Sequence, residues 1–335
     1  MPAEYPTLMD VARRSGDKSV SEIVEILNKT NPIIDDIPWI ECNSGVTHIT
    51  TIRTGIPKPA WRMLNSGVPL AKSTTKQIKA GCGMLEVYSE VDEDQVNLAK
   101  RNGGQQGAAD YLASENAAFI EGFGQEIARV FFYGDPSDPK EPVGLINYYN
   151  SLDGEVAAHG NVIDAGGTGA DNTSIWLIQW GDRAVHGIYP QGSKAGLTEN
   201  YLGVHTVKDA EGKQFQAHRT HYKWDNGLVV RDWRCAVRIA NVSMEKLKGA
   251  AADAPNICEL LTRATYALPQ SSGSTRSAIY CRKEVLTALD LQVQNKSNLM
   301  LNYETVFGRK CITFRGIPLR EQETLLDTEA AVVGA

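Results

Sequence analysis

The stretch from residue 42 to residue 85 places the strongest constraint on how this chain folds. Two runs rich in β-branched residues, His48–Thr54 and Thr75–Ile78, predict strands. The residues between them are interrupted by Pro57, Pro59, Gly67 and Pro69. Few apolar side chains remain to build a core, and a two-stranded hairpin is only marginally stable alone in water. We therefore expect an extended loop that lies against another surface.

The same stretch is basic. It contains no Asp or Glu but six cations: Arg53, Lys58, Arg62, Lys72, Lys76 and Lys79. The chain as a whole has a net charge of −6, which leaves −12 on the remainder. The cations could bind DNA, be solvated, or lie on an acidic surface of another subunit. The overall acidity and the single aromatic residue Trp61 argue against DNA, and the acidic remainder favours the third interpretation. Exposed ion pairs would orient such a contact more than stabilise it.

The composition is that of an ordinary globular protein, with 42% hydrophobic and 22% charged residues among 335. No apolar run is long enough to span a bilayer, and the N-terminal residues MPAEYPTLMDVARR lack the apolar core of a secretory signal. We therefore expect folding in a cytoplasm. The six cysteines form no CxxC pair, which favours buried reduced thiols over a zinc or redox site.

Apolar periodicity predicts two helices in the first half of the chain. Ser19 and Glu22 have capping-box spacing before a short helix that ends ahead of Pro32, so the first 46 residues resemble an arm that packs elsewhere. After Gly103 and Gly104, the proline-free segment Gln105–Tyr133 repeats apolar residues at spacings of three, four and seven. It predicts a helix about 40 Å long.

Strand patterns dominate the second half, so the sequence predicts an α+β fold. A long hairpin is expected from Phe215–Trp224 and Leu228–Ala240, joined by Asp225-Asn226-Gly227. The remaining predicted strands are 173–180, 184–189, 277–281 and 310–319, and the remaining predicted helices are 243–250, 255–268 and 283–289.

Three local patterns invite a chemical interpretation, and each one fails. The glycine-rich run 166–171 lacks the third glycine of GxGxxG and precedes a strand rather than a helix. His218 and His221, near Asp225, are three residues apart and so point to opposite faces of a strand, which disfavours metal chelation. Ser193 stands in the wrong place for a GxSxG elbow. A triad of residues scattered along the sequence stays open, but we predict no catalytic, cofactor-binding or metal-binding residue.

Long phrases of the chain carry a family resemblance. They include NPIIDDIPWIE, HITTIRTGIPKPAWRMLNSGV, AFIEGFGQEIARVFFYGD, GGTGADNTSIWLIQWGDRAVHGIYPQGSKAGL and RTHYKWDNGLVVRDWRCAVRIAN. These phrases resemble the major capsid proteins of short-tailed phages related to epsilon-fifteen. With further phrases on either side, the resemblance extends from about Thr7 to Arg320. The order of arm, basic loop, long helix and mixed lobe is similar to the Johnson fold of tailed-phage capsid shells.

The resemblance implies a division of the chain. It comprises an N-terminal arm (1–46), an extended loop (47–80), a peripheral domain with the spine helix (81–134), a first axial part (135–199), the long hairpin (200–241) assigned to the peripheral domain, and a second axial part (242–335). The loop residues expected to contact a neighbouring subunit are Arg53, Lys58, Trp61, Arg62 and Lys72.

The implied function is a structural one without catalysis. Hexamers and pentamers of this chain would form an icosahedral shell that encloses double-stranded DNA without sequence-specific binding. The expected partners are a separate scaffolding protein, a portal and a decoration protein, with assembly in the bacterial cytoplasm, residence in the virion and no membrane. Some family members cross-link neighbours through a Lys–Asn bond, but no acceptor motif accompanies Lys58, Lys72, Lys76 or Lys79, so we expect no cross-link. The alternatives are a soluble α+β hydrolase and a different virion component, such as a connector.

Overall fold

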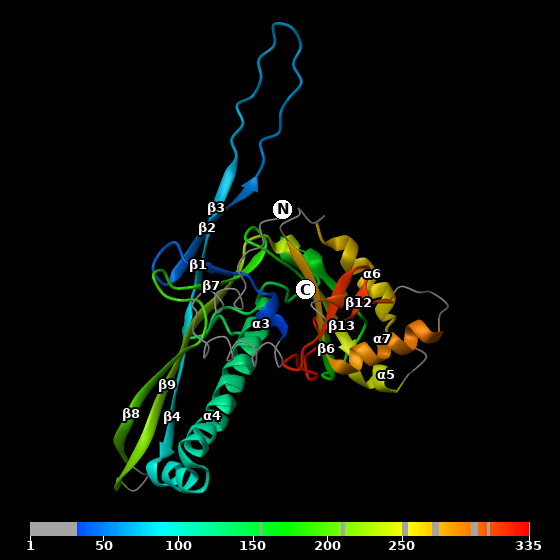
Figure 1. Cartoon of the computed structure of the whole chain (residues 1–335). Helices are drawn as coiled ribbons and strands as arrows, with labels where there is room; N and C mark the ends of the chain where they lie inside the picture. Colours follow the sequence, from blue (N-terminus) through cyan, green and yellow to red (C-terminus); the bar gives the residue numbers. More distant parts are fainter. Residues whose placement is uncertain are drawn as a thin grey trace.

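The computed structural model describes residues 32–154, 156–208, 212–249, 254–269, 275–295, 301–306 and 309–334. The predicted short helix that ends before Pro32 lies outside these residues. Runs of consecutive strands, β1–β4, β5–β10 and β12–β14, are separated by helices, and this mixed content confirms the predicted α+β class. Within the described residues, twelve strands join in one sheet and a separate hairpin projects from the body (Figure 1).

The strands are β1 (Trp39–Glu41), β2 (Thr47–Gly55), β3 (Thr74–Gly81), β4 (Gly83–Asp92), β5 (Val162–Asp164), β6 (Asn172–Trp180), β7 (Val185–Tyr189), β8 (Thr198–Lys208), β9 (Gln214–Val230), β10 (Ala236–Ser243), β11 (Arg276–Cys281), β12 (Leu301–Val306), β13 (Arg309–Phe314) and β14 (Ile317–Glu321). The helices are α3 (Pro32–Asp36), α4 (Glu93–Tyr133), α5 (Met244–Lys248), α6 (Ile257–Ala267) and α7 (Lys283–Asn295). The main path of the sheet runs β12-β13-β14-β11-β6-β7-β9-β4, with β10 beside β6 and β8 beside β9.

Strand β6 lies at the centre of the body because both of its faces are covered. All nine of its residues are buried. Trp176 and Trp180 pack against α3 and α4 on one face, whereas Ile175 and Leu177 pack against α5, α6 and α7 on the other. Its apolar run Ile175–Ile178 fits this two-sided burial.

Helix α4 confirms the predicted long helix and adds an earlier segment to it. The Asp92 side chain caps its first turn by accepting from the backbone N–H of Asp94. The backbone leaves helical geometry at Gly104, where φ is 67°, so the predicted start after Gly104 coincides with a kink. Five of the apolar residues that defined its periodicity are buried: Ile120, Phe123, Ile127, Val130 and Phe131. The helix runs alongside β4 and β9 (Figure 1).

The predicted hairpin through Asp225-Asn226-Gly227 is wrong. These residues continue the single strand β9, which pairs with β8 and β4 in its first part and with β7 in its last part. Gly227 is needed for close packing rather than for a turn, because a Cβ atom there would lie 2.6 Å from the Gly81 carbonyl oxygen. The hairpin is instead formed by β8 and β9, and Ala236–Ser243 forms β10, which pairs with β6 and β5.

The predicted strand 310–319 is also wrong, because it is two strands. Arg315 and Gly316 have φ values of 53° and 78°, which fit a two-residue turn between β13 and β14. The first 46 residues were expected to form an arm that packs elsewhere, but residues 32–42 pack on this chain's own body. Ile33, Ile34 and Trp39 are buried in this chain's own core beside α4. Their aliphatic and aromatic side chains complete that core.

A buried ion pair joins distant parts of the body. Arg238 of β10 donates to Glu329 at 2.8 Å, to the Ser174 hydroxyl at 2.9 Å and to the Tyr149 carbonyl at 2.8 Å. Glu329 also accepts from the Tyr133 hydroxyl at the end of α4. Since both charged side chains are almost fully buried and hydrogen-bonded, the network fixes the C-terminal segment to β6, β10 and α4.

Removing one member of this pair should be costly. We expect Arg238→Ala to lower the free energy of unfolding by about 3–5 kcal/mol, because it leaves the Glu329 carboxylate buried without its cation. Arg234→Ala is the control, since Arg234 is exposed and its partner Asp232 is only half-buried, so the loss should cost about 1 kcal/mol or less. Urea denaturation of the isolated subunit measures both. Equal losses would contradict the assigned role of the buried pair.

Candidate inter-subunit surfaces

Strands β2 and β3 form a hairpin that leaves the body. They pair antiparallel from Thr47 opposite Gly81 to Gly55 opposite Thr74, and this two-stranded sheet is separate from the main one. Figure 1 shows the loop beyond the two strands extending away from the body, while the base of the hairpin lies beside β1 and β7. This confirms both predicted strands. The strands pair with each other through their backbones. Most residues of β3 are exposed, whereas β2 is mostly half-buried, with Thr50 buried near the base and Thr51, Arg53 and Thr54 exposed further out.

The stretch 56–73 beyond the strands presents apolar side chains to solvent. A turn at Leu64 and Asn65 reverses the chain, and Asn65 has a φ of 66°. Trp61 and Leu70 are fully exposed and Leu64 is 93% exposed. The other exposed apolar residues here are Ile56, Met63 and Val68. Of these six, sequence analysis selected only Trp61, because apolar residues scattered between prolines show no periodicity.

The five residues predicted to contact a neighbour all lie on this projection. Arg53 is on β2, whereas Lys58, Trp61, Arg62 and Lys72 are in the stretch 56–73, and all five are exposed. The Arg62 guanidinium donates to the Ser66 carbonyl at 3.4 Å. Among the described residues, none of the hairpin's six cations has a carboxylate partner, so their charges are free to act on another surface.

The base of the hairpin is fixed to the body. The Asn43 side chain donates to the Ile49 carbonyl and accepts from its N–H, both at 2.8 Å. His186 of β7 is fully buried and lies edge-on to His48, with ring centroids 5.5 Å apart. Burial lowers the pKa of His186 to about 4, and the neighbouring His48 contributes to that shift. His186 is therefore uncharged near neutral pH, whereas the hairpin and the stretch beyond it carry six cations.

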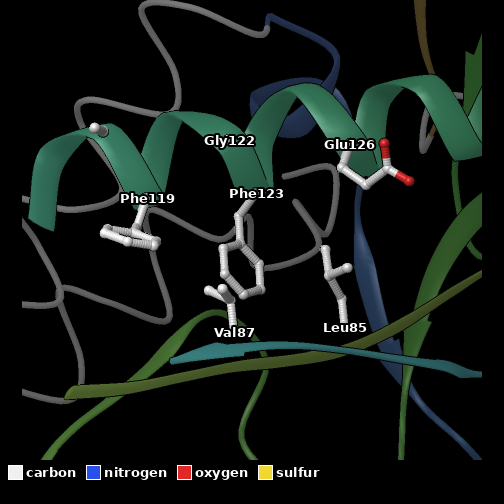
Figure 2. Close-up of a pocket in the computed structure, with 7 residues that line it drawn as sticks. Leu85, Val87, Phe119, Gly122, Phe123 and Glu126 are labelled. Carbon is white, nitrogen blue, oxygen red and sulfur yellow. The ribbon is translucent and has the colours of Figure 1, made fainter. Parts of the chain in front are cut away.

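A second open surface is an apolar groove between α4 and β4. Phe119 and Phe123 point from the helix toward Val87 and Leu85 of the strand (Figure 2). Its volume is about 330 Å³, and Ala118, Gly122 and Glu126 complete its lining. Phe119 stacks on Tyr222 of β9, with ring centroids 5.8 Å apart. A Cβ atom on Gly122 would meet nothing within 4 Å, so the missing side chain leaves the groove open.

The motifs examined for chemistry have structural partners instead. Asp171, at the end of the glycine-rich run, accepts from the Glu245 N–H and the Ser243 hydroxyl, and these bonds lower its pKa. His218 contacts the Tyr201 hydroxyl, whereas His221 contacts Glu86. The Ser193 hydroxyl donates to the Pro190 carbonyl.

The cysteines whose side chains the structure describes are free thiols. Cys42, Cys235 and Cys281 are buried free thiols, and Cys82 and Cys258 are half-buried free thiols. No cluster of three or more metal-ligating side chains occurs in the described ranges. None of the helices in that part of the chain combines the length and apolarity required to cross a membrane.

A well-packed body that carries an uncovered, partly apolar projection and an open apolar groove defines a structural subunit of an assembly. Similarity to known proteins identifies the kind of assembly. The family model for major capsid protein GP7 matches residues 15–333, so this chain belongs to that family. No curated protein matches it.

Solved structures agree with the family. A chain from the cryo-EM structure of bacteriophage Epsilon15 is 32% identical, with a TM-score of 0.70, and the match covers 89% of this chain and 88% of that one. Chains from a native GTA particle capsid and from Mycobacterium phage Adephagia are each 10% identical over 60% of this chain, with TM-scores of 0.41. Those matches cover 86% and 84% of the two chains and are too weak to support further argument.

These findings confirm the predicted family, the tailed-phage capsid fold and the structural role. The protein is a component of a phage capsid shell and is not an enzyme. The alternative function of a soluble hydrolase therefore has no support. The family match also favours the major capsid protein over a different virion component such as a connector.

The groove can be tested as a contact by filling it. We expect Gly122→Leu to preserve or slightly raise subunit stability, because leucine forms helix better than glycine by up to about 1 kcal/mol and the space is open. We also expect the substitution to reduce particle yield if a neighbouring subunit inserts into the groove, because the leucine side chain would then occupy that space. Negative-stain electron microscopy and thermal unfolding measure the two effects.

Ala113→Leu is the matched control for this variant. Ala113 is exposed on the same helix. It precedes Gly122 by nine residues, which corresponds to a rotation of about 180°, so it lies on the opposite side of the helix. Its particle yield should equal that of the unmodified protein. Normal particles from Gly122→Leu would exclude the groove as an assembly contact.

Proposed function

We propose that this chain assembles with copies of itself, as hexamers and pentamers, into an icosahedral shell that encloses double-stranded DNA. The observation that carries the proposal is the β2–β3 hairpin, whose tip exposes apolar side chains and whose cations have no carboxylate partner among the described residues. Exposed apolar side chains grouped on one projection are typical of a surface that another protein covers.

In this proposal, the extended loop of one subunit lies across its neighbour. Trp61 supplies the buried apolar contact, since a large aromatic side chain contributes strongly when it is desolvated. Arg53, Lys58, Arg62 and Lys72 orient the loop on the acidic remainder of the neighbouring chain, because charge complementarity favours one register over others. Obligate interfaces commonly bury about 2,000–5,000 Å², and symmetry repeats each contact around the shell.

The two halves of the body have proposed places in the shell. Helix α4 with β4, β8 and the first part of β9 forms the peripheral domain. The sheet around β6 with α5, α6 and α7 forms the axial domain, near the five-fold and quasi-six-fold axes. The grouping of α5, α6 and α7 with β6 is supported by a core cluster that contains their residues and none from α4.

The proposal includes partners outside this chain. A scaffolding protein, a portal and a decoration protein would act with the shell, and assembly would take place in the bacterial cytoplasm. The chain's net charge of −6 suits a container that holds DNA without sequence-specific contacts. Neighbours would be held without covalent bonds, so particles boiled in detergent would release a monomer-sized band rather than a ladder.

Charge reversal on the hairpin tests the proposed contact. We expect Arg53→Glu with Arg62→Glu to leave a soluble, folded subunit, because both side chains are exposed, but to reduce particle formation at least tenfold. A loss of about 1.4 kcal/mol per contact already gives a tenfold weaker association. Sedimentation of expressed protein separates subunits from particles.

Two further variants sharpen this experiment. Lys140→Glu with Lys208→Glu makes the same change in net charge at exposed positions outside the hairpin and should assemble normally. Trp61→Ala removes apolar area without changing charge and should impair assembly as well. Normal particles from the Arg53 and Arg62 variant, or equal impairment by the Lys140 and Lys208 variant, would contradict the role assigned to the hairpin.

A further inference from the structure

Two cysteines meet where the hairpin joins the body. Cys42 directly follows β1, and Cys82 separates β3 from β4, so the pair flanks the whole projection in the sequence. Their Sγ atoms lie 3.5 Å apart, and both are free thiols. Ile188 and Val229 pack around Cys42, and Ala80 and Cys82 lie against the same small cluster.

The backbone holds both residues in this position. The Cys42 N–H donates to the Tyr189 carbonyl and the Cys82 N–H donates to the Val46 carbonyl, each at 2.9 Å. The two sulfur atoms are therefore kept in van der Waals contact by separate elements of the fold. A disulfide needs them about 2.05 Å apart, a difference that small side-chain rotations can provide.

We propose that Cys42 and Cys82 form a disulfide that closes the base of the extended loop once the protein is exposed to a small-molecule disulfide oxidant such as oxidised glutathione. The thiolate of one cysteine attacks the oxidant, forms a mixed disulfide and releases one reduced thiol. The second thiolate attacks the protein sulfur of that mixed disulfide and releases the other reduced thiol. Two protein thiols are oxidised, one small disulfide is reduced, and the two protons pass to the released thiolates.

The environment of the pair makes this reaction slow. Burial raises the pKa of both thiols, and the pKa of Cys82 is raised further by Cys42 beside it. Little thiolate therefore exists near neutral pH. The half-buried Cys82 is more accessible to the oxidant than the buried Cys42 and is the expected first nucleophile. In a reducing cytoplasm the pair stays reduced, whereas an oxidising medium favours the disulfide.

The bond would fix the hairpin at its origin. It links residues 40 positions apart and encloses β2, the tip and β3 in one covalent loop. Such a link restricts the unfolded chain and prevents the two ends of the hairpin from separating. Because the chemistry belongs to a single subunit, it can be tested whether or not the subunit forms a shell.

The test is to oxidise the purified full-length chain with oxidised glutathione, block remaining thiols with N-ethylmaleimide and map the unreduced peptides by mass spectrometry. We expect one cross-linked pair of peptides, containing Cys42 and Cys82 and lacking two hydrogen atoms. We also expect the midpoint of thermal unfolding to rise by roughly 5 °C and to return after reduction with dithiothreitol.

Serine variants provide the controls. Cys42→Ser and Cys82→Ser should each abolish the cross-link, whereas Cys258→Ser, at another half-buried cysteine, should retain it. The peptide map of the unmodified chain shows whether the Cys42–Cys82 disulfide forms, even if a variant fails to fold. Recovery of both Cys42 and Cys82 as N-ethylmaleimide adducts, or their appearance in a disulfide between two chains, would overturn the proposal.

Discussion

The structure depends on one constraint, which is that a two-stranded hairpin cannot bury either of its own faces. Strands β2 and β3 pair with each other through their backbones, but only the base of the hairpin is covered by the body, and the stretch 56–73 adds exposed Trp61, Leu64 and Leu70. The free energy that orders this projection must therefore come from another surface. In the proposed assembly, a neighbouring capsid subunit supplies that surface. The projection is then incomplete only in the isolated chain.

The rest of the molecule provides a rigid support for that projection. Strand β6 is buried on both faces, and the Arg238–Glu329 pair fixes the C-terminal segment against it. Asn43 and His186 hold the base of the hairpin to the same body. A rigid body matters in a symmetric assembly, because contacts that are individually modest add together only when every copy presents them in the same geometry.

Sequence predicted those parts of the fold whose signals are local. Alternating β-branched residues gave β2 and β3, and apolar periodicity gave most of α4. Errors arose where tertiary packing decides the role of a residue. Gly227 appeared to mark a turn, but it is required because another backbone passes close to it, and Arg315 entered a turn that no local pattern announced. The groove beside Gly122 and the contact between Cys42 and Cys82 join residues far apart in sequence, so one chain without its fold could not reveal them.

Under the proposed assembly, the charge pattern explains how an exposed apolar tip avoids the wrong partner. The residues from Cys42 to Leu85 carry six positive charges and no negative ones, so two hairpins repel each other before their tips can meet. The remainder carries −12 and attracts the hairpin instead. Apolar contact supplies most of the stabilisation, since exposed ion pairs contribute only about 0–1 kcal/mol each, whereas the charges select which surface is contacted. Specificity and stability thus come from different side chains on the same projection, and neither set would suffice alone.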